Sequence, residues 1–261
     1  MALDIKKLLD TKYRFYNQEE FIETDPIQIP RAFSRKEDIE IAGFIAAAIA
    51  WGKRPMIIRN ANRWLEMMDN APYDFVINAQ DEDFKPLLHF VHRTFNGDDA
   101  LFFISSLQNI YQNHGGLEAV FAEGLKQEFD NPKNYAPLFG ALNHFRAVFM
   151  SSPHLARSGK HLANPMKGSA AKRLNMYLRW MVRQDQQGVD FGIWKRIEPK
   201  HLMIPLDVHS GRVARKLGLL QRKANDWKSV EELTASLRKF DATDPVKYDF
   251  ALFGMGVFGE M

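Results

Sequence analysis

The chain has 261 residues and a formal net charge of +3, with 46% hydrophobic and 26% charged residues. This composition is typical of a folded protein with a sizeable core, and it argues against a disordered chain. The absence of cysteine excludes disulfides, iron–sulfur clusters and thiol nucleophiles. No apolar run is long enough to cross a bilayer and the N-terminal segment has no apolar signal core, so we expect a cytoplasmic protein without membrane association.

The spacing of apolar residues predicts helices along almost the whole chain. The first is expected over residues 3–16, followed by a loop over residues 17–35. Ser34 precedes Glu37 by three residues, the spacing of a capping box, which predicts an apolar helix that ends near residue 51. Pro55 then opens a helix that runs to about residue 69. Further helices are expected over Asp83–Val91, Asp98–Gln112, Leu117–Phe129, Tyr135–Met150, Ala170–Arg183, Val208–Leu217, Ser229–Phe240 and Pro245–Phe258.

The least regular stretch covers residues 151–166, which carry Pro and Gly steps and are expected to form a basic loop. No segment has the alternating pattern of a strand, so we predict an all-α, multi-helix fold. We expect an N-terminal helix and loop over residues 1–36. A single unit over residues 37–261 should follow, built of two helical lobes, about 37–150 and 151–261, with the functional site between them.

The small net charge hides an uneven distribution. Residues 156–223 hold 15 Lys and Arg but only 4 Asp and Glu, a local excess of eleven positive charges. Like charges repel unless a polyanion or an anionic ligand screens them, so this stretch favours a nucleic-acid surface. A solvated helix face without a partner is the alternative.

Asp207 is the most informative single position. It follows an apolar run over residues 202–206 and directly precedes an expected helix. An Asp at this place caps the helix, which is a structural role. The same placement also holds a carboxylate ionised and fixed in direction, so that it can stabilise a developing cationic sugar or accept a proton.

The string Asp207-x-His209-x-x-Arg212-Val213 resembles the Val-Asp-Thr-His-x-x-Arg-Val segment of the helix–hairpin–helix base-excision DNA glycosylases, the superfamily of endonuclease III and the 8-oxoguanine glycosylases. Residues 164–178 resemble the hairpin and the helix after it, residues 248–256 the helix that closes the fold, and residues 41–54 the helix that leads to the base-probing loop. The whole chain also resembles a family of uncharacterised bacterial proteins with this architecture.

The resemblance implies a glycosylase-like all-α fold with a degenerate helix–hairpin–helix motif. It implies that Asp207 is catalytic and that Lys172 is the Schiff-base lysine of bifunctional members. The hairpin departs from the superfamily pattern because Met166 replaces its first glycine and only Gly168 remains. Counting forward from Gly168 places Ala170, not Lys172, at the nucleophile position, so a phosphate contact is the alternative role for Lys172. The 35 residues between Lys172 and Asp207 imply an insertion over residues 184–199.

The remaining candidates surround this pair. We expect His209 to support the loop and Trp51 to stack an extruded base. A metal site formed by His201, Asp207 and His209 is a weaker alternative, and we expect no metal or cofactor. The candidate DNA-backbone contacts are Lys160, Lys167, Gly168, Arg173, Arg212, Arg215 and Lys216.

Three functions fit these observations. The first is a DNA-repair glycosylase, with or without AP-lyase activity, that acts as a monomer on a damaged or mismatched base in double-stranded DNA. The second is a non-catalytic nucleic-acid-binding protein of the same fold. The third is a protein whose basic stretch binds a small anionic ligand.

Overall fold

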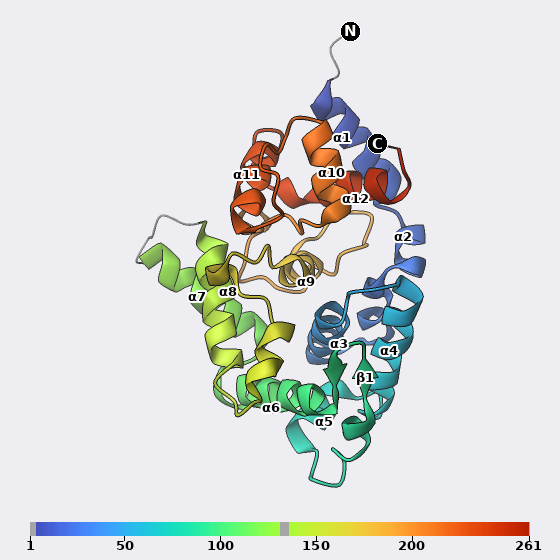
Figure 1. The fold of residues 1–261 in the computed structure, drawn as a ribbon, viewed down its shortest axis with the longest axis vertical. Coiled ribbons are helices and arrows are strands. Elements are labelled where there is room, and N and C mark those ends of the chain that lie inside the picture. Colours follow the sequence, from blue (N-terminus) through green and yellow to red (C-terminus); the bar gives the residue numbers. More distant parts are fainter. Residues whose placement is uncertain (1–3, 131–135, 261) are drawn as a thin grey trace. The chain divides into compact units, whose positions relative to one another are not determined.

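The computed structural model describes residues 4–130 and 136–260 (Figure 1). The chain divides into two compact units: unit 1 comprises Met1–Glu23 and Asn164–Met261, and unit 2 comprises Thr24–Ala163. The N-terminal helix therefore shares a unit with the C-terminal part of the chain. The expected organisation had set residues 1–36 apart and had placed the boundary between the lobes near residue 150.

The predicted all-α class is confirmed, with one addition, a two-stranded antiparallel hairpin of β1 (Val91–His92) and β2 (Phe95–Asn96). The α-helices in the described residues are α1 (Ile5–Tyr16), α2 (Glu19–Thr24), α3 (Lys36–Ala48), α4 (Arg54–Glu66), α5 (Pro72–Asn78), α6 (Gly97–Asn113), α7 (Leu117–Asp130), α8 (Pro137–Phe149), α9 (Lys172–Val182), α10 (Val208–Lys216), α11 (Trp227–Arg238) and α12 (Asp249–Val257).

Several expected boundaries were wrong. Arg35, not Ser34, is the N-cap residue of α3, and no side-chain hydrogen bond caps this helix. The helix expected over Asp83–Val91 is instead a turn, a 3-10 helix over Pro86–His89 and strand β1. The short helices α2 and α5 were not predicted. Tyr135, the expected start of the helix that corresponds to α8, lies outside the described residues.

The core of unit 2 is built from aromatic rings. Phe44 on α3 packs against Phe103, Phe145 and Phe149, with ring centroids 5.4 to 5.8 Å apart, and Trp64 on α4 lies 6.2 Å from Phe103. All five side chains are at most 1% exposed. Burial of each large ring contributes about 1.5–3 kcal/mol to folding, so this cluster fixes α3, α4, α6 and α8 together.

In unit 1, α12 packs against both α1 and α10 (Figure 1). Two glycines permit this close packing: a Cβ on Gly254 would lie 2.3 Å from the Tyr16 ring of α1, and a Cβ on Gly256 would lie 2.8 Å from the His209 carbonyl oxygen of α10. The start of α10 is therefore held at a fixed place on α12. No helix in the described part of either unit is both long enough and apolar enough to span a membrane.

Candidate functional site

Residues 164–171 correspond to the predicted hairpin and lead directly into α9, whose first residue is Lys172. Asn164 caps a 3-10 turn over Pro165–Lys167, and Gly168 (φ +83°) then takes the left-handed conformation that glycine adopts without strain. Ala171 is also left-handed (φ +47°), and α9 begins at the next residue. The segment directly before the hairpin is a 3-10 helix over Ala156–His161, so the predicted helix–hairpin–helix motif has no α-helix immediately before its hairpin.

Asp207 performs the structural role expected from its position. Its Oδ1 accepts hydrogen bonds from the amides of His209 (2.8 Å) and Ser210 (3.0 Å), and the Ser210 hydroxyl accepts one from the Asp207 amide (3.0 Å). This reciprocal arrangement satisfies the free amides at the start of α10. It commits one carboxylate oxygen, Oδ1, to the cap.

The other oxygen faces the second candidate residue. Lys172 Nζ lies 4.0 Å from Asp207 Oδ2, and both side chains are half-buried. The ammonium group also lies 3.6 Å from Met176 Sδ and 5.9 Å from the centroid of the Phe253 ring. The structure thus brings together two residues that are 35 positions apart in sequence, with apolar groups on the flanks of the lysine.

A single loop ties the hairpin to Asp207. The Asn225 side-chain amide donates to the Asp207 carbonyl oxygen (3.0 Å), and the Trp227 amide donates to the Gly168 carbonyl oxygen (3.0 Å). An isolated bridge pairs Ser169 with Asp226, in the same loop. The hairpin and the start of α10 therefore share one backbone support, and this support fixes the Lys172–Asp207 geometry.

Asp249, the first residue of α12, is a charged group that the sequence analysis missed. Its Oδ2 lies 2.5 Å from Arg179 Nη1, while its Oδ1 is buried and has no hydrogen-bond partner among the described residues. Burial raises the pKa of this carboxyl to about 6; Arg179 and Lys172 act to lower it, and Asp207 acts to raise it. The only sequence signal was an Asp directly before an apolar helix, which also fits a simple helix start.

The insertion expected over residues 184–199 folds back onto α9. The Trp194 amide donates to a carbonyl oxygen near the end of α9 (2.9 Å). Asp190 bridges two buried guanidinium groups, with Oδ1 3.2 Å from Arg179 Nε and Oδ2 3.0 Å from Arg183 Nη1. Part of the positive excess of residues 156–223 is therefore neutralised inside unit 1 and does not reach its surface.

The predicted DNA-backbone contacts of unit 1 fall into two groups. Arg212 donates to the Gly256 carbonyl oxygen (2.7 Å), which His209 Nδ1 also approaches (3.4 Å), and Arg215 donates to Asn225 Oδ1 (2.6 Å) and to carbonyl oxygens of the same loop. These arginines hold the site together. Residues of the second group lie at the surface or close to it: Lys167, Gly168 and Lys216 are exposed, and Arg173 is half-buried, with a pKa that burial lowers to about 10.

With this geometry established, the comparisons with known proteins place the chain in a family. The family described as proteins of unknown function, DUF2400, matches residues 25–258. The chain belongs to this family. No curated protein and no solved structure matches it.

Two predicted residues of the DUF2400 chain belong to unit 2. Trp51 is half-buried at the end of the α3 segment, with the His92 ring edge-on at 4.7 Å and the His161 ring stacked at 5.9 Å. Lys160 is exposed on the neighbouring 3-10 helix. The indole thus already has two ring neighbours within its own unit.

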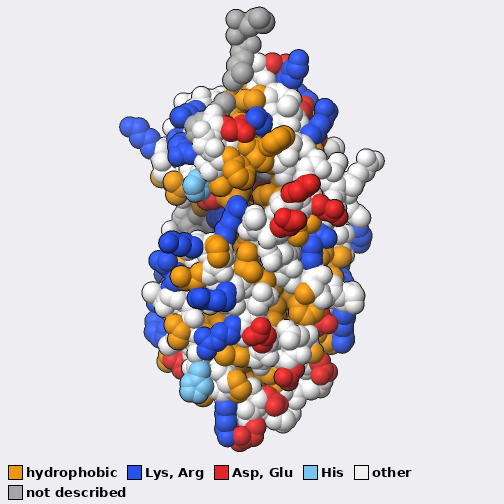
Figure 2. Space-filling model, turned by 90° about the vertical axis from the view of Figure 1, so that its right-hand side faces the viewer, with side chains coloured by type: hydrophobic (Ala, Val, Ile, Leu, Met, Phe, Trp, Pro, Cys, Tyr) orange, Lys and Arg blue, Asp and Glu red, His pale blue; other side chains and the backbone are white. Residues whose placement is uncertain are grey.

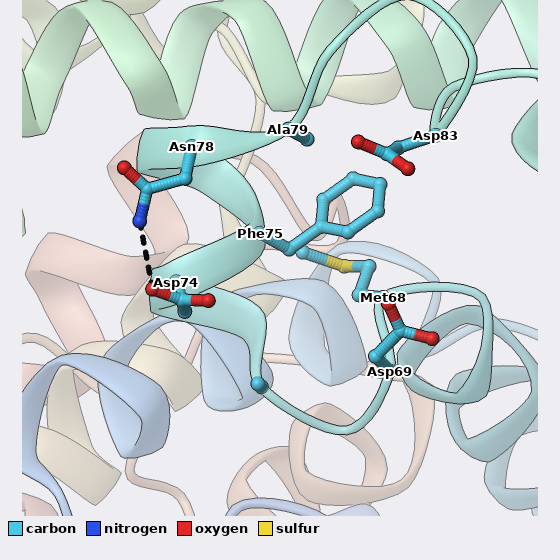
Figure 3. Close-up of a pocket in the computed structure, with 8 residues that line it drawn as sticks. Met68, Asp69, Asp74, Phe75, Asn78, Ala79 and Asp83 are labelled. Atoms are coloured by element: carbon cyan, nitrogen blue, oxygen red, sulfur yellow. Dashed lines mark hydrogen bonds between the residues drawn. The ribbon is translucent and has the colours of Figure 1, made fainter.

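Unit 2 of the DUF2400 chain also carries an open pocket that contains none of the predicted site residues (Figure 3). Its carboxylates are partly engaged: the Asn78 side chain donates to Asp74 (2.7 Å), and the Gln80 amide donates to Asp83 (2.8 Å). The described residues contain no group of three or more His, Asp or Glu side chains arranged to hold a metal ion, whether here or around Asp207. The lining residues are Met68, Asp69, Ala71, Asp74, Phe75, Asn78, Ala79 and Asp83.

Proposed function

We propose that this DUF2400 protein is a DNA-repair glycosylase with AP-lyase activity, which removes a damaged or mismatched base from double-stranded DNA. The observation that carries the proposal is the approach of Lys172 Nζ to within 4.0 Å of Asp207 Oδ2. The resemblance to the glycosylases assigned a catalytic role to each residue separately, on segments far apart in sequence. Their meeting beside the hairpin supports both assignments.

The two carboxylate oxygens of Asp207 have different partners, which explains how one residue can be both structural and reactive. Oδ1 is held by the amides at the start of α10, so the carboxylate cannot rotate. Oδ2 is directed to Lys172. A fixed negative charge of this kind stabilises positive charge that develops on the sugar, and it needs no reorganisation during the reaction.

The chemistry follows from these positions. The bond between the base and C1′ breaks, the base leaves with the electron pair, and Asp207 stabilises the cationic sugar. Lys172, after giving a proton to Asp207, adds its neutral amine to C1′. The C1′–O4′ bond then breaks, O4′ takes the second amine proton, and an imine remains. Loss of a C2′ proton breaks the C3′–O bond, so the 3′ phosphate leaves and the strand is cut.

A second candidate keeps Lys172 protonated. The observation that favours it is that the two residues already form an ion pair. Asp207 would then orient a water molecule for attack on C1′, which removes the base and leaves the strand intact.

The decisive test of base removal uses Asp207→Asn. The Asn side chain can still accept the amide hydrogen bonds of the cap, so α10 is preserved while the charge is lost. We expect single-turnover base release from a panel of lesion duplexes to fall at least about 100-fold, with duplex binding unchanged.

The matched control is Asp4→Asn. Asp4 caps α1 by accepting from the Lys7 amide, and it belongs neither to the hairpin nor to the loop that supports it. We expect this variant to release base at the wild-type rate. Equal release by the Asp207→Asn variant and the wild type, or no release by the wild type from any duplex, would refute the proposal.

A further inference from the structure

A second group of positive charges lies on unit 2 and contains none of the predicted DNA-backbone contacts. Residues 51–65 contain four Lys and Arg and no Asp or Glu. Lys53, Arg59 and Arg63 of this stretch are exposed at the start and along the outer face of α4. Arg93, in the turn between β1 and β2, is exposed as well. We call Lys53, Arg59, Arg63 and Arg93 the α4 cation surface.

Contacts at three points hold the segment from His89 to Arg93, which includes strand β1, against α4 and the residues just before it. A Cβ on Gly52 would lie only 3.3 Å from Arg93 Nη1. The buried His92 ring lies 2.8 Å from the Asn60 side chain, and Arg63 donates to the carbonyl oxygen of His89 (3.4 Å). Strand β1 ends at the buried His92, and Arg93 begins the turn that follows, with its side chain exposed. Arg93 therefore lies beside Gly52, close to the start of α4.

These four cations have no neutralising carboxylate among the residues that the structure describes. None of them forms an ion pair with any residue in the described ranges 4–130 and 136–260. Arg179 and Arg183 of unit 1, by contrast, are buried against carboxylates. Figure 2 shows Lys and Arg side chains running down one side of the face that unit 2 presents. Uncompensated positive charge on a folded surface attracts an external anion.

The arrangement of the charges indicates the form of that anion. Lys53, the N-cap residue of α4, and Arg63 are ten residues apart, a distance of about 15 Å at 1.5 Å per residue. This is the length of about four base pairs of duplex DNA at 3.4 Å per base pair. A small anion would need converging side chains, whereas exposed cations spread over about 15 Å match the successive phosphates of a strand.

We propose that the α4 cation surface binds the phosphate backbone of double-stranded DNA, as a contact surface on unit 2 separate from the Lys172–Asp207 site. The choice of DNA as the ligand rests on the proposed function. Because the contacts are made to phosphates, the surface binds without reading sequence, and its contribution depends strongly on salt.

The test is the salt dependence of binding to an undamaged 20-base-pair duplex, followed by fluorescence anisotropy. Each phosphate that the protein neutralises contributes about −0.9 to the slope of log K against log salt. The triple variant Arg59→Gln, Arg63→Gln, Arg93→Gln is therefore expected to have a slope shallower by about 2 to 3 than the wild type. Lys53→Gln, whose side chain makes no hydrogen bond or ion pair with a described residue, is expected to lose about 1.

The matched control removes the same charge elsewhere. Arg14, Lys126 and Lys239 are exposed on α1, on α7 and at the end of α11. Their replacement by Gln is expected to leave the slope close to that of the wild type. Equal slopes for the two triple variants, or an unchanged slope in Lys53→Gln, would overturn the inference. Because this readout needs no base release, it stands apart from the Asp207→Asn test, which decides the proposed function.

Discussion

Asp249 Oδ2 lies 2.5 Å from Arg179 Nη1 in the interior of unit 1, and the other oxygen of the same carboxylate is buried without a hydrogen-bond partner in the described part of the chain. Burial outweighs the attraction of the arginine and raises the pKa of Asp249 to about 6. A carboxyl group that titrates near neutral pH therefore interacts electrostatically with both Lys172 and Asp207.

The raised pKa of Asp249 predicts the direction in which the free energy of unfolding changes with pH. Its folded-state pKa, about 6, lies above the value of about 3.9 for an unfolded chain, so the folded state binds the proton more tightly. The stability that it contributes is complete below about pH 4 and is lost as the pH rises through 6. We expect the free energy of unfolding of the wild type, relative to Asp249→Asn, to fall by up to about 3 kcal/mol between pH 4 and 7, as measured by urea unfolding.

Asp185 serves as a control, because its pKa is shifted in the opposite direction from that of Asp249. Its pKa is lowered to about 2, because the attraction of Arg183 and hydrogen bonds from Tyr13, Arg183 and Asn17 outweigh burial. The stability that it contributes is present above about pH 4 and is lost as the pH falls through 2. The wild type should therefore gain stability relative to Asp185→Asn as the pH rises from 2 to 4. A difference between the wild type and Asp249→Asn that stays constant from pH 4 to 7 would contradict the assignment.

The contact between α10 and α12 predicts a cost for one added methyl group. A Cβ at position 256 would lie 2.8 Å from the His209 carbonyl oxygen, a backbone atom that can move only with its helix. We expect Gly256→Ala to lower the free energy of unfolding by about 1–3 kcal/mol. It should also slow base release, since the Asp207 cap moves with α10.

The comparison for that variant is Val257→Ala on the same helix. Val257 is 36% exposed, so its truncation should change stability by no more than about 0.5 kcal/mol. Urea unfolding of both variants checks the prediction, which fails if Gly256→Ala is as stable as Val257→Ala.

Much of the fold could be predicted from local patterns, and the errors have local causes. Long helices such as α6 and α7 have clear apolar spacing and were found. The start of α6 is set by Asn96, whose side chain accepts from the Asp99 amide while the Asp99 carboxylate accepts in return. The hairpin of β1 and β2 was missed because each strand has only two residues, too few for an alternating pattern.

The same distinction between local and long-range interactions decides which parts of the candidate site could be predicted from the sequence. The Asp207 cap depends on its immediate neighbours, so the sequence predicted its position. The pairing of Asp249 with Arg179 joins residues 70 positions apart, and no local pattern encodes it. For the same reason the sequence did not show that Arg212 and Arg215, which stay predicted DNA contacts, also donate to backbone carbonyl oxygens of unit 1.

The most direct test of the proposed lyase site is borohydride trapping on a duplex with an abasic site. Borohydride reduces the imine between Lys172 and C1′ to a stable amine, which links the protein to the DNA. The proposal predicts a covalent adduct with the wild type that maps to the Lys172 peptide, disappears in Lys172→Ala, and persists in Lys167→Ala, which removes the exposed hairpin lysine. No adduct with the wild type, or an equal yield from Lys172→Ala, would contradict it.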